Sequence, residues 1–177
     1  MDAEETKYTR VEYERRFLVS PHANWRSAVE SYSKTFEDKY IRNTKLRLRL
    51  LTDSDTGRQV IKLNKKLDSD SPYFQTISRI LLSPGEYKLL DGIEGDSLRK
   101  TRYYHNHLGR VFSIDVFEGE LDGLVLCETE ADGLEELMSV EPPAYAKPEV
   151  TEDAFFTGGN LCRTSRTELL RKLSTFA

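Results

Sequence analysis

Two pairs of glutamates in this chain have the spacing of side chains that share one face of a β-strand. Glu12 and Glu14 lie in residues 11–18, and Glu128 and Glu130 lie in residues 124–131. Alternate residues of a strand point to the same face, so the two carboxylates of a pair lie about 7 Å apart. Such carboxylates repel each other unless a cation lies between them, and hard cations such as Mg²⁺ and Mn²⁺ take oxygen ligands. A Glu-x-Glu strand by itself more often forms a solvated surface face, so the other strands must show whether these glutamates form a metal site.

Basic residues with the same alternate spacing occupy three further stretches. They are Arg47 and Arg49, Lys62 and Lys66, and Lys100 and Arg102. Exposed sheet faces usually mix the two signs, whereas here the sign is sorted by strand. Either these faces lie in water around an apolar core, or they line the interior of a closed sheet whose apolar outer faces are covered by helices. The pattern leaves both placements open, because buried charges are costly unless they are paired.

The inward placement requires a ligand that balances the charges. With Arg16 and Asp115 included, the charged strand faces carry seven basic and five acidic residues, a net charge of +2. One or two divalent cations and a bound triphosphate, which carries about four or five negative charges, bring the sum to within about two charges of zero. A linear phosphate anion with Mg²⁺ or Mn²⁺ therefore fits such an interior.

The elements that would position these residues are mostly strands joined by short turns. Strands are expected at residues 11–18, 40–51, 59–67, 74–82, 98–105, 110–118 and 124–131, with strand or loop at 149–156. An amphipathic pattern predicts a helix over residues 24–36, and capping boxes predict helices that begin at Ser83 and Ser165. Hairpins join antiparallel strands. A sheet of eight such strands can close into a barrel, which has no exposed sheet edges. We predict an α+β, mainly β fold: a closed eight-stranded antiparallel β-barrel with short helices packed on its outside.

Length and composition narrow the class of protein. The chain has 177 residues, which fits one domain over residues 1–177. Its net charge of −4 gives no general attraction to nucleic acid or to anionic membranes. No apolar run approaches the ~20 residues that span a bilayer, and the first ten residues lack a secretory pattern. Cys127 and Cys162 do not have the spacing of a disulfide framework or a zinc site. We expect a cytoplasmic protein with reduced thiols.

The order of the charged motifs resembles that of the CYTH domain, the triphosphate tunnel metalloenzyme family, and of its bacterial branch in particular. The motifs are Glu12-Tyr13-Glu14-Arg15-Arg16, Leu46-Arg47-Leu48-Arg49, Lys62-Leu63-Asn64-Lys65-Lys66, Arg99-Lys100-Thr101-Arg102-Tyr103, Asp115-Val116-Phe117-Glu118-Gly119 and Glu128-Thr129-Glu130, followed by Phe156-Thr157-Gly158-Gly159. The similarity covers residues 9–170. It implies a tunnel-shaped barrel that hydrolyses or cyclises triphosphates with Mg²⁺ or Mn²⁺.

The resemblance also implies roles for single residues. The metal ligands would be Glu12, Glu14, Asp115, Glu128 and Glu130. The residues that clamp the phosphates would be Arg16, Arg47, Arg49, Lys62, Lys66, Lys100 and Arg102. Glu12 and Glu14 would also position the attacking water, and Tyr40 and Lys66 would protonate or steady the leaving phosphate.

The chain departs from the family pattern at three places. Arg16 stands where the family usually has lysine, so the charge is kept but the side chain cannot act as a base. Asn64 stands where threonine is common. The strand at residues 74–82 lacks most of the arginines and glutamates that it often carries, and its polar residues are Gln75, Thr76, Ser78 and Arg79. We expect metal-dependent hydrolysis of a triphosphate, above all inorganic tripolyphosphate. The alternatives are a class IV-type adenylate cyclase and a non-catalytic module that binds polyphosphate or an organic phosphate. The expected partner is the small-molecule triphosphate, a homodimer is allowed for, and neither nucleic acid nor membrane is expected.

Overall fold

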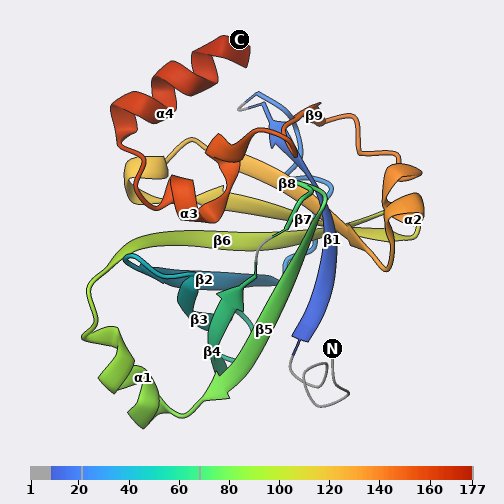
Figure 1. The fold of residues 1–177 in the computed structure, drawn as a ribbon. Coiled ribbons are helices and arrows are strands. Elements are labelled where there is room, and N and C mark those ends of the chain that lie inside the picture. The colour runs from blue at the N-terminus through green and yellow to red at the C-terminus, as the bar shows by residue number, and fades with distance from the viewer. Residues whose placement is uncertain (1–8, 21, 68, 177) are drawn as a thin grey trace.

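The computed structural model describes residues 9–20, 22–67 and 69–176. Within these residues the chain forms nine β-strands and four short α-helices (Figure 1). The strands are β1 (Thr9–Val19), β2 (Ser33–Ile41), β3 (Leu46–Asp53), β4 (Gln59–Lys66), β5 (Phe74–Leu82), β6 (Gly95–His107), β7 (Arg110–Phe117), β8 (Val125–Ala131) and β9 (Ala146–Glu149). The helices are α1 (Pro84–Asp91), α2 (Leu134–Met138), α3 (Gly158–Leu161) and α4 (Arg166–Leu173), and 3₁₀ turns cover Gly119–Leu121, Ala154–Phe156 and Ser174–Phe176.

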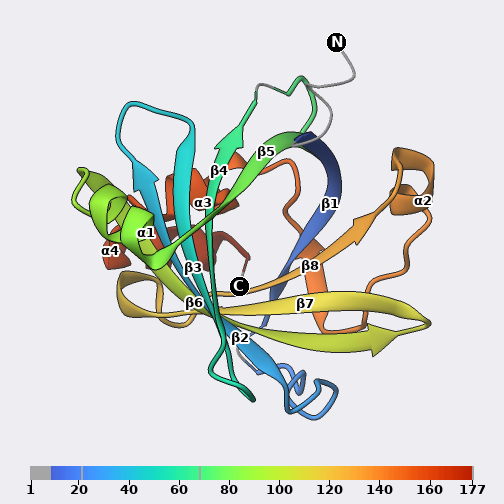
Figure 2. The same ribbon diagram turned by 90° about the horizontal axis from the view of Figure 1, so that it is seen from below.

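Eight of the strands close into a barrel. Their order is β5-β4-β3-β2-β6-β7-β8-β1, and a further pairing between β1 and β5 joins the two ends. Every pair is antiparallel. β9 is an extra strand that pairs with the C-terminal end of β1, where Phe17 lies opposite Glu149. Seen along the sheet in Figure 2, the strands surround a common interior. The prediction of a closed eight-stranded antiparallel barrel is confirmed.

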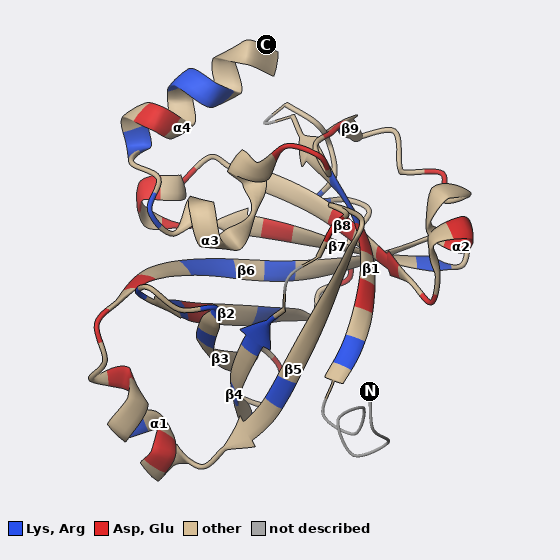
Figure 3. Cartoon of the chain, in the orientation of Figure 1, with Lys and Arg blue, Asp and Glu red and all other residues tan. Residues whose placement is uncertain are grey.

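The charged strand faces point into this interior. The inward positions alternate along each strand, as with Glu12, Glu14 and Arg16 of β1 or Lys100 and Arg102 of β6, because successive side chains lie on opposite faces. Basic residues on β4 and β6 and acidic residues on β1 and β7 are visible in Figure 3. The structure therefore decides for the inward placement that the sequence left open.

Apolar side chains close one end of the barrel. The inward-facing Leu98, Phe117 and Leu126 belong to a buried cluster with Phe156 and Leu161, which come from the segment around α3. In Figure 1 this segment and α4 lie over the same end of the barrel. The barrel interior is consequently polar over most of its length and apolar at the end that α3 covers.

The predicted helix over residues 24–36 is wrong. Its last four residues, 33–36, belong to β2, in which Phe36 and Asp38 face inward and alternate with outward residues. β2 pairs with β3 and β6. Trp25, from the predicted apolar stripe, is 4% exposed and packs 5.7 Å from the Tyr103 ring on the outer barrel face. The local pattern of apolar residues thus reflects one tertiary contact and one strand, and not the face of a helix.

The predicted strand over residues 40–51 is two strands. A turn with Asn43 at φ 59° separates β2 from β3. Asparagine tolerates this left-handed conformation better than most residues do, so the turn has a local cause. Only residues 40 and 41 of the predicted strand belong to β2, and most of β2 lies before them. β2 is therefore a strand that the sequence analysis did not predict, and it completes the eight strands of the barrel.

The two capping boxes are present, at Ser83 for α1 and at Ser165 for α4. Leu169 of α4 is buried in the apolar cluster, whereas α1 has no buried residue and stands off the barrel wall (Figure 2). Residues 158–159, which the sequence analysis treats as part of a glycine-containing motif, begin the short helix α3. No helix in the described part of the chain is long and apolar enough to cross a membrane.

Candidate active site inside the barrel

The barrel encloses a polar cavity of about 290 Å³. Of the thirteen residues predicted from the sequence, all except Asp115 line it: Glu12, Glu14, Arg16, Tyr40, Arg47, Arg49, Lys62, Lys66, Lys100, Arg102, Glu128 and Glu130. Asp115 is fully buried in the wall beneath Lys100 and Arg102. Strand pairing therefore brings together residues that are up to 118 positions apart in the chain.

One wall of the cavity consists of β1 and β8. Glu14 lies directly opposite Glu130 in the cross-strand register, and Arg16 lies directly opposite Glu128. Burial raises the pKa of Glu130, and the charges of Glu12 and Glu14 raise it further. Burial also raises the pKa of Glu14, with Glu128 adding to the effect. Glu12, Glu14 and Glu130 thus bring negative charge close together, and a bound cation would relieve their mutual repulsion.

Arg16 bridges two carboxylates of this wall. Its Nε donates to Oε1 of Glu128 at 2.9 Å, and its Nη2 donates to Oε1 of Glu14. The second oxygen of Glu128 accepts a bond of 2.6 Å from Nη2 of Arg102. Burial would raise the pKa of Glu128, but Lys100, Arg16 and Arg102 together hold it well below its usual value. Glu128 is therefore charged and fully engaged by cations of the chain itself.

Two buried aspartates fix the orientation of further basic residues. Asp115 accepts bonds of 2.6 Å from Nε and Nη2 of Arg102, and Lys100 donates to the same carboxylate. Asp38 accepts two bonds of 2.6 Å from Arg49. Such pairs with two parallel bonds hold a guanidinium in one orientation. Arg49, Lys100 and Arg102 are thus held by aspartates before any ligand arrives.

The part of the wall formed by β3, β4 and β5, which continues from β1, has buried polar groups without partners. Arg47, Asn64 and Arg79 form one row across β3, β4 and β5, since Asn64 pairs with both arginines. Nε of Arg47, Nε of Arg79 and both amide atoms of Asn64 are buried without a hydrogen-bond partner in the described structure. Buried polar groups are nearly always paired in native proteins. This row therefore marks a place where an acceptor-rich ligand would be bound.

Two lysines flank that row on β4. Lys62 and Lys66 face the cavity, and neither has an ion-pair partner among the described residues. Burial lowers the pKa of Lys66 to about 8, and the nearby Arg47 contributes. Burial lowers the pKa of Lys62 too, with Arg79 as the next cause. An added anion would stabilise the ammonium form of both lysines and raise their pKa.

Tyr40 lies where the polar cavity meets its apolar end. Nη1 of Arg47 donates to the hydroxyl of Tyr40 at 3.4 Å. The hydroxyl also lies against Gly158 of α3, so closely that a Cβ atom there would be 2.0 Å from it. Burial raises the pKa of Tyr40, which therefore remains a hydroxyl at neutral pH. It can steady Arg47 and can donate a hydrogen bond of its own.

Several solved structures share the fold of this chain. The inorganic triphosphatase NE1496 aligns with a TM-score of 0.56 and 24% identity, over 86% of this chain and 95% of its own. PH1819 from Pyrococcus horikoshii OT3 aligns with a TM-score of 0.53 and 20% identity, over 92% and 99%. A candidate adenylate cyclase from Bacillus halodurans aligns with a TM-score of 0.53 and 12% identity, over 85% and 100%. The chain has the CYTH triphosphate-tunnel fold. No family model matches the chain, and no curated protein matches its sequence.

The tunnel contains more charged residues than the sequence analysis identified. Arg10, Lys34, Asp38 and Arg79 also line it. Lys34 was hidden in the stretch predicted as helix, Asp38 lay between that stretch and the next predicted strand, and Arg79 stood in a strand that seemed poor in charge. Arg79 donates to Oε1 of Glu12 at 2.9 Å and so links β5 to the acidic wall. Alternation along residues 33–41 was the signal that could have revealed Lys34 and Asp38.

The complete charge count of the tunnel interior differs from the predicted one. Among the residues that the structure describes, ten basic and six acidic side chains face inward, which gives a net charge of +4. The basic residues are Arg10, Arg16, Lys34, Arg47, Arg49, Lys62, Lys66, Arg79, Lys100 and Arg102, and the acidic residues are Glu12, Glu14, Asp38, Asp115, Glu128 and Glu130. An excess of this size in a partly enclosed space favours a polyanionic ligand.

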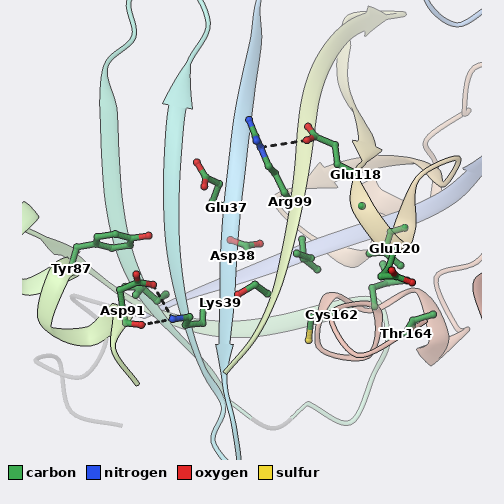
Figure 4. Close-up of a pocket in the computed structure, with 16 residues that line it drawn as sticks. Glu37, Asp38, Lys39, Tyr87, Asp91, Arg99, Glu118, Glu120, Cys162 and Thr164 are labelled. Atoms are coloured by element: carbon green, nitrogen blue, oxygen red, sulfur yellow. Dashed lines mark hydrogen bonds and ion pairs between the residues drawn. The ribbon is translucent and has the colours of Figure 1, made fainter. Parts of the chain in front are cut away.

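A larger cavity, of about 590 Å³, lies outside the tunnel between α1 and the segment around α3. Figure 4 shows Tyr87 and Asp91 on one side of it and Cys162 and Thr164 on the other. Some of its charges are paired, as in the 2.9 Å ion pair between Lys39 and Asp91. None of the thirteen residues predicted from the sequence lines this cavity, so it is not the candidate site.

The predicted metal ligands divide into two groups by what their oxygens contact. Both oxygens of Asp115 and both oxygens of Glu128 accept bonds from basic residues. Glu12, Glu14 and Glu130 keep oxygens that make no hydrogen bond in the described structure. No three acidic, histidine or cysteine side chains of the described residues are close enough to form a finished metal site. The chemistry of Glu12, Glu14 and Glu130 nevertheless fits a hard divalent cation, because they are oxygen donors whose mutual repulsion a cation would relieve.

Proposed function

We propose that the chain hydrolyses a phosphoanhydride bond of a short linear triphosphate, most of all inorganic tripolyphosphate, inside the tunnel. The observation that carries the proposal is the row of buried polar groups without partners at Arg47, Asn64 and Arg79, on strands that continue from the wall of carboxylates. A phosphate chain offers oxygens to the first wall, and its counter-ion is attracted to the second. A sheet that only needed a stable core would gain nothing from this separation of charge.

The basic residues of the tunnel would bind and orient the triphosphate. Arg47, Lys62 and Lys66 have donor capacity to spare, and Arg49, Lys100 and Arg102 are already aligned by their aspartates. Such fixed positive groups stabilise the charge that spreads over the phosphoryl oxygens as the bond to the leaving group breaks. They need no rearrangement during the reaction, which is the advantage of orienting them in advance.

Glu12, Glu14 and Glu130 would hold a divalent cation, Mg²⁺ or Mn²⁺, whose chemistry is to neutralise phosphate charge and to activate water. Glu12 and Glu14 face the open part of the cavity, and their free oxygens can accept a hydrogen bond from the attacking water. In this role the carboxylates orient the water toward the phosphoryl group. The apolar end formed by Leu98 and Phe117 limits the access of further water.

Lys66 is the group best suited to protonate the leaving phosphate. With its pKa lowered to about 8, the ammonium form predominates at neutral pH but gives up its proton more easily than an ordinary lysine does. Tyr40 stays protonated and can donate a hydrogen bond to the same region, through its position beside Arg47. The roles of the two residues in protonation are proposals that rest on these positions.

Orthophosphate release tests the proposed function. The purified chain is incubated with tripolyphosphate, ATP or thiamine triphosphate, each with Mg²⁺ or Mn²⁺, and phosphate is measured over time. We expect turnover with tripolyphosphate that ceases when the metal is chelated. Cyclic AMP formed from ATP without orthophosphate would instead identify a cyclase. Tight binding of tripolyphosphate without turnover under every metal condition would identify a binding module. The same preparation, examined by sedimentation, tests whether the chain forms a homodimer.

A further inference from the structure

Two successive cross-strand pairs on β1 and β8 differ in charge. Glu14 opposite Glu130 is a pair of two acids, and Arg16 opposite Glu128 is a pair of a base and an acid. Like charges directly opposite each other destabilise a sheet, whereas opposite charges stabilise it. The first pair contains no cation of its own and is compensated only in part, by Arg16 beside Glu14 and by Arg10 at 3.9 Å from Glu130, whereas the second pair contains a cation.

In the second pair, the guanidinium of Arg16 occupies the space between two carboxylates. It donates to Glu128 at 2.9 Å and also to Glu14, so it lies between two carboxylates that the family resemblance assigns to metal. The other oxygen of Glu128 is held by Arg102 at 2.6 Å. The side chain of Arg16 is 14% exposed and that of Glu128 is 10% exposed, so water screens the contact little. A lysine could not form this bridge in the same way, since its single ammonium lacks the planar fork of a guanidinium.

The charge of the tunnel supports a single metal ion. The interior has a net charge of +4, and a triphosphate carries about four or five negative charges. One divalent cation leaves the filled tunnel within about two charges of neutrality. A second would leave about three or four uncompensated positive charges in a poorly hydrated space, which is costly.

We propose that Arg16 takes the place of a divalent cation between Glu14 and Glu128, so that the tunnel holds its triphosphate with one divalent cation. That cation is bound on the side of Glu12, Glu14 and Glu130. The inference rests on the proposed triphosphate site, but it concerns how many metal ions the site takes and not whether the bound anion is cleaved. In this arrangement Arg16 is a positioning residue, because it fixes the two carboxylates and leaves the phosphates to the basic wall.

Counting bound Mn²⁺ tests the inference without measuring turnover. The chelator-treated protein is titrated with Mn²⁺, and the free ion is followed by electron paramagnetic resonance. We expect one Mn²⁺ per chain in the wild type. Arg16→Gln removes the bridging charge and frees oxygens of Glu14 and Glu128, so we expect two. Arg99→Gln is the matched control, because Arg99 pairs with Glu118 on the exposed outer side of the barrel, and it should bind one.

A second variant separates this inference from the family assignment of Glu128. Glu128→Gln should still bind one Mn²⁺, with a dissociation constant within about threefold of the wild type, since Glu128 contacts arginines and not the metal. A loss of the site, or a weakening of tenfold or more, would make Glu128 a metal ligand and overturn the proposal. Two ions or none in the wild type, or one ion in a folded Arg16→Gln protein, would overturn it as well. If Arg16→Gln does not fold, as judged by circular dichroism, the Glu128→Gln titration decides.

The outcome is independent of the hydrolase assay. A chain that binds one Mn²⁺ in this pattern but releases no orthophosphate would keep the role of Arg16 and lose the proposed hydrolysis. A chain that cleaves tripolyphosphate but binds two Mn²⁺ would keep the proposed hydrolysis and lose the role of Arg16.

Discussion

Glu14 of β1 and Glu130 of β8 lie directly opposite each other in the barrel wall. Both carboxylates face the cavity, and burial together with neighbouring acids raises the pKa of each. Side chains opposed in this way have Cβ atoms about 5 Å apart, so the two charges repel each other strongly without a cation. This pair stores electrostatic energy in the empty tunnel that binding of a metal ion would release.

The first prediction concerns this pair. Glu130→Gln should reduce turnover of tripolyphosphate by at least about 100-fold at limiting Mg²⁺, because a hard-cation site loses an oxygen ligand. The metal-free protein should melt at the same or a higher temperature, since the like-charge repulsion is gone. Glu118→Gln, which removes a carboxylate from the outer side of the barrel, is the control. Wild-type turnover in Glu130→Gln would exclude the carboxylate from the metal site.

The second prediction concerns binding to the basic wall. Tripolyphosphate with Mg²⁺ at a hundredfold excess over its dissociation constant should stabilise the protein by about 2.7 kcal/mol. At ~2–4 °C per kcal/mol this raises the melting temperature by several degrees. Arg47→Gln should lose most of this shift in melting temperature, because the Nε of Arg47 is a buried donor that the phosphate would supply with an acceptor. Arg99→Gln should keep it, and equal shifts in both variants at low and physiological salt would contradict the assignment of Arg47.

The third prediction is a pH dependence set by Lys66. If its ammonium protonates the leaving phosphate, kcat/KM should fall as the pH rises through about 8, the pKa of the folded, ligand-free enzyme. Lys66→Met should lower kcat by about 100-fold or more and remove this alkaline decline. The effect on stability has the opposite direction: the folded pKa lies below the unfolded one, so the unfolded chain binds more protons between pH 8 and ~10.4. The stability of the wild type relative to Lys66→Met should therefore improve as the pH rises through that window.

The fourth prediction concerns the buried Asp38. Arg49 and Arg47 outweigh the effect of burial and lower the pKa of Asp38 to about 2. Asp38→Asn leaves Arg49 without its buried carboxylate and should destabilise the protein by about 3–5 kcal/mol at pH 7. Because the folded pKa is depressed, this contribution is present above the unfolded pKa of ~3.9 and is lost as the pH falls toward 2. Urea unfolding of both proteins at pH 7, 4 and 3 measures whether the difference narrows, and exposed Asp122→Asn should differ little at any pH.

The fifth prediction concerns Gly158, which lies against the hydroxyl of Tyr40. Gly158→Ala would place a Cβ 2.0 Å from that hydroxyl, so Tyr40 must move and take its contact with Arg47 along. We expect a loss of about 1–3 kcal/mol in stability and a higher KM for tripolyphosphate. The neighbouring Gly159→Ala is a matched control in the same helix, since its Cβ would lie 3.9 Å from the Tyr40 ring, an ordinary contact. If both variants behave like the wild type, the packing of Tyr40 against α3 has no part in the site.

Local patterns in the sequence were sufficient for much of the framework. The alternation of residues 59–66 and 74–82 gave β4 and β5 almost to the residue, because each charged or apolar face keeps a period of two. The capping boxes at Ser83 and Ser165 marked the starts of α1 and α4, since a cap depends on residues within one turn. The failure over residues 24–36 has the same origin: a spacing that suits a helix was produced by Trp25 packing on the barrel and by the start of β2.

Residue type and the period of two were enough to identify the side chains that could form the site, because the sign of the charge is sorted along each strand. That these faces point inward, and which charges meet, depends on the folded barrel. The bridge from Arg16 to Glu14 and Glu128, and the bonds from Arg102 to Asp115 and Glu128, join strands whose register no local pattern reveals. Register is set by the pairing of whole strands and the closure of the barrel between β1 and β5, and a shift of one residue would turn every one of these side chains to the other face.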